Sequence, residues 1–80
     1  MTAPSPPVIA PVLGNLIKLA RIDKRLTQDE LGEALDVRQS TVSMWETGKQ
    51  RPRVHQLGPL AAALGISRDA LLAAVDSETS

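Results

Sequence analysis

A row of hydrogen-bonding side chains lies in the stretch RQSTVSMWETGK, residues 38–49. If this stretch is helical, residues at i, i+1, i+4 and i+5 share one side, and these are Gln39, Ser40, Ser43 and Met44. Val42 and Trp45 point the other way and can join an apolar core. The outer row has no partner inside the chain, so we expect its hydrogen bonds to be directed at another molecule.

Basic residues are concentrated around the same stretch, although the net charge of the chain is zero. Residues 1–37 carry four basic and five acidic side chains, and residues 54–80 carry one basic and three acidic ones. Residues 38–53 hold four basic side chains against Glu46, a net charge of +3: Arg38, Lys49, Arg51 and Arg53. This distribution favours an anionic partner, and a solvated basic loop is the alternative explanation.

The composition excludes several other classes of protein. The chain has 80 residues and no cysteine, so we expect one small domain without a disulfide or a thiolate metal site. No apolar run has the length of a membrane span, and the proline-broken start is not a signal peptide, which predicts a cytoplasmic protein. The single histidine, His55, has no carboxylate at a ligand spacing, so we expect neither an enzyme nor a cofactor.

The remaining pattern predicts the elements that position the row. Apolar residues at helical spacing, few aromatic residues and no strand signal predict an all-α fold of five short helices. A first helix is expected from Leu13. Thr27 and Glu30, in TQDE, form a capping box that begins the second helix. Asp36 and Gly48 tolerate the left-handed conformation and are expected to end the second and third helices.

The C-terminal half is predicted to hold two more helices. Gly58 and Pro59 interrupt the fourth, so we expect VHQ to form a loose turn and the regular helix to begin near Pro59. Gly65 closes this helix and Ser67 caps the last one. The predicted organisation is a proline-rich arm over residues 1–12, a domain over residues 13–75 and a tail over residues 76–80.

The stretch LTQDELGEALDVRQSTVSMWETGKQRP resembles the Cro and phage-repressor type, also called Xre-like, of helix-turn-helix DNA-binding domains. The resemblance covers roughly Leu13 to Leu72. It rests on LTQ, on W-E-x-G-K, on the proline after the basic loop and on ALGIS, in that order. It implies a repressor-like domain whose second and third helices form the helix-turn-helix. It also implies contacts with DNA for five residues: Gln28, Gln39, Ser40, Thr41 and Met44.

The side chains of the row match the edges of base pairs in the major groove. The Gln39 amide can pair with N6 and N7 of adenine, Ser40 and Ser43 can serve several bases, and Met44 offers an apolar contact to a thymine methyl. Backbone phosphates are expected to meet six residues around the row: Gln28, Arg38, Thr41, Lys49, Arg51 and Arg53. The sequence therefore predicts a sequence-specific regulator that binds double-stranded DNA as a homodimer, in the role of a repressor.

Five residues concern the packing and the ends of the first and third helices. We expect Trp45 to point inward. The resemblance implies an ion pair between Arg21 and Glu46 that joins the first and third helices and orients the latter. Arg38 stands where the family has a capping Ser or Thr, and Arg25 replaces the glycine that ends the first helix, where a left-handed conformation is strained.

A protein-binding regulatory module of the antitoxin or repressor-partner type is the alternative function. Leu16, Leu19 and Ile22 are expected to form an apolar stripe open to water on the first helix. We favour the apolar part of the N-terminal arm, PVIAPV, as its cover, with a partner or second subunit as the alternative. Leu72 and Val75 on the last helix are the more ordinary candidates for a dimer contact.

Overall fold

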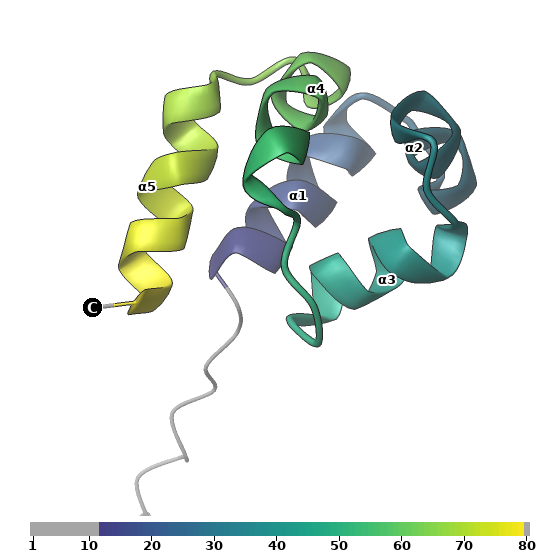
Figure 1. The fold of residues 1–80 in the computed structure, drawn as a ribbon. Coiled ribbons are helices and arrows are strands. Elements are labelled where there is room, and N and C mark those ends of the chain that lie inside the picture. Colours follow the sequence, from purple (N-terminus) through teal and green to yellow (C-terminus); the bar gives the residue numbers. More distant parts are fainter. Residues whose placement is uncertain (1–11, 80) are drawn as a thin grey trace, which may run out of the picture.

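The fold was derived from a computed structural model that describes residues 12–79, with side chains to residue 77. Over this range the chain forms five helices and no strand (Figure 1). Their order is α1 (Val12–Asp23), α2 (Gln28–Leu35), α3 (Gln39–Thr47), α4 (Val54–Leu64) and α5 (Arg68–Thr79). None of these helices is long and apolar enough to cross a membrane. The predicted all-α fold is confirmed, and the predicted arm lies, except for Val12, outside the described residues.

The helix-turn-helix has the ends that the sequence predicts. The Thr27 hydroxyl accepts from the N–H of Glu30, and the Glu30 carboxylate accepts from the N–H of Thr27, both at 3.0 Å. Asp36 ends α2 with φ 57° and Gly48 ends α3 with φ 80°, both left-handed. Arg38 precedes α3 without a side-chain cap. Local chemistry therefore delimits both helices of the motif.

The end of α1 is strained, as expected from Arg25. Its φ is 59°, in the left-handed region that favours glycine. Two backbone bonds close the helix around it: Arg25 N–H donates to the Ile22 carbonyl at 2.9 Å, and Leu26 N–H donates to the Arg21 carbonyl at 3.0 Å. This is the Schellman pattern, whose left-handed position is normally a glycine. The hydrogen bonds hold Arg25 in a conformation that it does not favour.

The predicted start of α4 is wrong. The helix begins at Val54 rather than near Pro59, and Pro59 lies inside it. Arg53 N–H donates to the Gln56 side-chain oxygen at 2.8 Å, which starts the helix one turn early. The residue before a proline normally avoids the α conformation because its Cβ and N–H meet the proline ring. Gly58 has no Cβ, so this part of the clash is absent and the helix continues.

The core lies where all five helices meet and is aliphatic except for Trp45. Trp45 is 2% exposed, which confirms that it points inward. The buried apolar residues are Leu13, Ile17, Leu31, Val42, Trp45, Leu57, Leu60, Ala61, Leu64, Leu71 and Ala74. Figure 1 shows α5 on the opposite side of the molecule from α2. Because α1 and α4 lie between them, the motif and the last helix present separate surfaces.

The α1 stripe is narrower than predicted. Leu16 is half-buried and packs against the core, since it lies between Leu13 three residues earlier and Ala20 four residues later on the buried face. The expectation that Leu16 is open to water is therefore wrong. Leu19 and Ile22 are exposed, at 65% and 50%. On α5, Leu72 is 36% exposed, whereas Val75 is half-buried against the core.

The backbones of α1 and α3 approach each other at Gly14. A Cβ on Gly14 would lie 2.5 Å from the Glu46 carbonyl oxygen and 2.7 Å from that of Trp45. Both distances are too short for carbon and oxygen, so no larger residue fits while the helices stay in place. The absence of a side chain at Gly14 sets how deeply α3 is seated on α1.

Candidate nucleic-acid interface

The turn between α2 and α3 is tight and is closed by backbone hydrogen bonds. Val37 N–H donates to the Gly32 carbonyl at 2.8 Å, across the left-handed Asp36. A Cβ on Gly32 would lie 2.7 Å from the Val37 carbonyl oxygen, so this approach also requires glycine. The two helices are side by side in Figure 1 and pack against each other. The predicted helix-turn-helix is present.

The two faces of α3 divide as the spacing predicts. Val42, Trp45 and Glu46 are buried against the core side. Of the predicted row, Gln39 and Ser40 are exposed, and Ser43 and Met44 are half-buried. Thr41 is also half-buried. At the other end of the helix, the Thr47 hydroxyl donates to the Ser43 carbonyl at 3.1 Å, so this hydroxyl is bonded within α3. The most accessible hydrogen-bonding groups therefore lie at the N-terminal end of α3.

The predicted ion pair joins α1 to α3. Arg21 Nε donates to Glu46 Oε2 at 2.6 Å, and Arg21 Nη2 donates to Glu46 Oε1 at 3.2 Å. The remaining guanidinium nitrogen, Nη1, donates to the Leu26 carbonyl at 2.7 Å. The side chains are only 12% and 4% exposed. A buried pair of this kind contributes more to orientation than to stability, because desolvation offsets most of the attraction.

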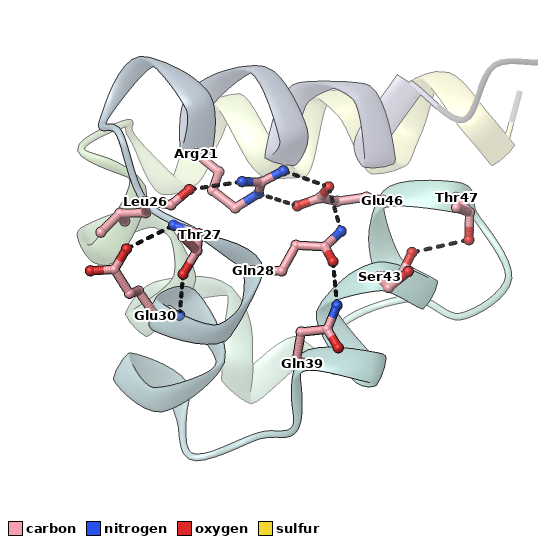
Figure 2. A network of polar contacts seen from close by, with 9 residues as sticks. All are labelled: Arg21, Leu26, Thr27, Gln28, Glu30, Gln39, Ser43, Glu46 and Thr47. Atoms are coloured by element: carbon pink, nitrogen blue, oxygen red, sulfur yellow. Dashed lines mark hydrogen bonds and ion pairs between the residues drawn. The ribbon is translucent and has the colours of Figure 1, made fainter.

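A chain of amides continues from this pair to the outer face of α3 (Figure 2). Gln28 Nε2 donates to Glu46 Oε1 at 3.1 Å, and Gln39 Nε2 donates to Gln28 Oε1 at 2.6 Å. Sequence reasoning assigned Gln28 to a phosphate and missed both bonds. The partners are 18 and 11 residues away from Gln28 in the chain, so no local pattern pointed to them. The side chain expected to read bases is thus linked to a buried carboxylate.

A hollow of about 620 Å³ opens beside this chain. Its lining comes from the end of α1 and the starts of α2 and α3: Arg21, Thr27, Gln28, Asp29 and Gln39. The first N–H groups of a helix lack intrahelical acceptors and carry the positive end of its dipole, which suits an anion. The hollow lies beside the exposed end of α3, and the Asp29 carboxylate also lines it.

Basic side chains lie at both ends of α3. Arg38 precedes the helix, and Lys49, Arg51 and Arg53 follow it in the segment that leads to α4; all four are exposed. Lys49 N–H donates to the Met44 carbonyl at 3.0 Å, so the segment turns back at the C-terminal end of α3. The predicted base-contacting row is therefore flanked by positive charge along the direction of the helix. The described residues contain no group of three or more side chains suited to hold a metal ion.

The same arrangement occurs in known regulators. A family model described as helix-turn-helix matches residues 17–71. Among solved structures, the P22 c2 repressor bound to a synthetic operator superposes with a TM-score of 0.70 at 30% identity, over 74% of this chain and 89% of that one. The master regulator of biofilm formation SinR, in complex with DNA, gives 0.68 at 33% identity, over 75% and 97%.

The regulator ClgR of Corynebacterium glutamicum superposes with a TM-score of 0.74 at 29% identity, over 90% of this chain and 77% of that one. No curated protein sequence matches the chain significantly. The family match covers well over half of the residues and includes α2, the turn and α3 in full. The chain therefore belongs to the Cro and phage-repressor type of the helix-turn-helix family of DNA-binding regulators.

Proposed function

We propose that the protein is a transcriptional repressor that reads double-stranded DNA by placing α3 in the major groove. The observation that carries this proposal is Gln39, which is exposed at the start of α3 and is held by a hydrogen-bond chain anchored on a buried ion pair. Base readout needs such a fixed donor and acceptor on an accessible helix. Two similar proteins, the P22 c2 repressor and SinR, were crystallised with DNA.

The outer face of α3 supplies the base contacts. Gln39 reads an adenine through its amide, Ser40 and Ser43 donate to or accept from neighbouring bases, and Met44 packs against a thymine methyl. Ser43 and Met44 are half-buried, so less of each side chain is available to a base than at the exposed Gln39. We therefore expect the sharpest base preference at the position read by Gln39.

Phosphate contacts surround this face. The second hydrogen of Gln28 Nε2 remains after its bond to Glu46, so Gln28 can donate to a phosphate seated in the hollow while it holds Gln39. Thr41 and the basic residues at the two ends of α3 bind the flanking phosphates: Arg38, Lys49, Arg51 and Arg53. Displacement of counterions by these groups makes the affinity fall steeply with salt.

A homodimer on a two-fold symmetric site is the expected assembly. One domain presents a single recognition helix, and two such helices read half-sites about one helical turn apart. The exposed Leu72 on α5, with Val75 beside it, is the proposed contact between subunits. The exposed pair Leu19 and Ile22 supports a second function, in which the domain binds a regulatory protein of the antitoxin or repressor-partner type.

Selection of bound duplexes from a random DNA pool tests the proposal. Gln39→Ala should lose about 1–3 kcal/mol at the selected site and relax the preference at one base pair. Arg51→Ala should weaken binding to selected and random duplexes about equally, with a smaller salt slope. The proposal fails if no sequence is enriched, or if both variants act alike on selected and random DNA.

A further inference from the structure

We propose that Glu46 is a positioning residue for base readout. Through Gln28, its carboxylate decides which atoms of the Gln39 amide face the DNA, and so sets a preference for adenine. The inference rests on the proposed function, because it assumes that Gln39 meets a base edge. Glu46 itself is 7% exposed and lies on the core side of α3, where it cannot touch DNA.

The direction of the hydrogen-bond chain follows from the chemistry of its anchor. Arg21 only donates and the Glu46 carboxylate only accepts, so Gln28 must turn its NH2 group toward Glu46. The Gln28 oxygen then faces Gln39, which must donate from its own NH2 group, and Gln39 Nε2 does donate to this oxygen at 2.6 Å. Each amide in the chain therefore has one allowed orientation.

This orientation leaves a defined pair of groups on Gln39. One N–H is used by Gln28, and the other N–H and the oxygen remain. If Gln28 takes the N–H that points away from the Gln39 oxygen, the remaining pair lies on one edge of the amide. Adenine presents an acceptor at N7 and a donor at N6, which this edge matches at both atoms. Guanine presents acceptors at both N7 and O6, and its O6 opposes the Gln39 oxygen.

Replacement of Glu46 by glutamine reverses the chain. Both carboxylate oxygens of Glu46 accept from Arg21, so the new NH2 group must displace one of these bonds. It takes the place of Oε1, whose bond to Nη2 is the longer at 3.2 Å, while the new oxygen keeps the 2.6 Å bond to Nε. Because Oε1 also accepts from Gln28, the new NH2 group then faces Gln28. Gln28 then offers its NH2 group to Gln39, and Gln39 turns its oxygen inward. The Gln39 edge now places its oxygen opposite the adenine N7 acceptor and its N–H opposite the N6 donor, so neither pair can form a hydrogen bond. An acceptor such as guanine O6 or thymine O4, in the place of N6, instead accepts from the Gln39 N–H. We expect the base preference to invert rather than to disappear.

The test compares dissociation constants for selected duplexes that differ only at the adenine position assigned by Gln39→Ala. The wild type should bind adenine over guanine by roughly 5- to 150-fold. Glu46→Gln should bind guanine or thymine more tightly than adenine. Glu33→Gln is the matched control, because it removes one exposed carboxylate from α2 outside the hydrogen-bond chain. It should keep the adenine preference, although its overall affinity for DNA rises.

Gln28→Met provides a second, less buried variant if Glu46→Gln does not fold. Without the hydrogen bond from Gln39 to residue 28, the Gln39 amide turns freely. The ratio of the affinities for adenine and guanine duplexes should therefore fall toward one without inverting. The double variant, Glu46→Gln with Gln28→Met, should have the same base preference as Gln28→Met alone, because a methionine at position 28 cannot pass the reversed orientation on to Gln39 by a hydrogen bond. A role of Glu46 in stability alone would weaken all duplexes and leave the ratio between bases unchanged.

Two results overturn the inference while leaving the proposed function intact. One is a wild-type adenine preference that Glu46→Gln retains in a folded protein, as judged by thermal unfolding. The other is a Gln28→Met variant with the wild-type ratio. If the wild type enriches no sequence from a random pool, the proposed function itself fails, and this outcome is distinct from both.

Discussion

The close approach of α1 and α3 at Gly14 predicts a large effect from a single methyl group. A Cβ at this position would lie 2.5 Å from the Glu46 carbonyl oxygen, about 0.9 Å inside the 3.4 Å at which ordinary contact begins. The obstacle is backbone on both sides, so neither a rotamer change nor a flexible side chain can relieve it. In Gly14→Ala the two helices must separate.

The magnitude results from two opposing terms. Overpacking against a rigid neighbour costs about 1–3 kcal/mol, and alanine regains about 1 kcal/mol of helix propensity over glycine. We expect the upper part of the first range, because two carbonyl groups are met at once, and therefore a net loss of about 1–2 kcal/mol. For a domain of this size, that lowers the Tm by about 4–16 °C.

Urea and thermal unfolding of Gly14→Ala measure this loss, and Asn15→Ala is the matched control. Asn15 is exposed on the same helix, so its replacement gains about 0.5 kcal/mol of propensity without a clash. Affinity for the selected DNA should also fall in Gly14→Ala, since α3 carries Glu46 with it. A Gly14→Ala variant as stable as the wild type would refute the close approach of the two helices.

Four further changes test other features. Arg25→Gly should raise the free energy of unfolding by about 0.5–1 kcal/mol, because relief of the left-handed strain exceeds the added entropy of the unfolded chain. A lower free energy of unfolding in urea would contradict this prediction. Pro59→Ala should stabilise α4 by about 1–2 kcal/mol by restoring a backbone hydrogen bond, and an unchanged Tm would count against that. Deletion of residues 1–11 should lower the Tm without changing the oligomeric state in sedimentation, if that segment covers Leu19 and Ile22. A dimer that becomes monomeric in Leu19→Glu with Ile22→Glu would instead assign the two residues to a second subunit.

Local rules were sufficient for most helix ends. The capping box at Thr27, the left-handed Asp36 and the glycine after α3 each depend on a few neighbouring residues, and the structure has them as predicted. The start of α4 was mispredicted because the prediction also used a local rule, one that considered a single residue. The rule against proline in a helix was applied to Pro59 without the effect of the preceding Gly58, whose missing Cβ removes part of the clash.

The candidate site was predictable in its outer residues and not in its inner connections. Spacing alone places Gln39 on the exposed side of α3, because it depends on helical geometry. The bonds from Gln28 to Glu46 and Gln39 depend on how three helices pack and on which rotamer results, and neither has a signature in the sequence. Leu16 was misplaced because the width of a buried face is set by the packing of neighbouring helices.

The burial of Trp45 has a spectroscopic consequence. It is the only aromatic residue of the chain, since tyrosine and phenylalanine are absent, and it lies on the inner side of the recognition helix. Intrinsic fluorescence therefore comes from one indole, without energy transfer from other side chains. Its emission maximum reports whether α3 is seated on the domain, and a shift toward longer wavelength signals entry of water behind that helix. The fluorescence of Trp45 therefore reports movement of the helix that we propose to read DNA.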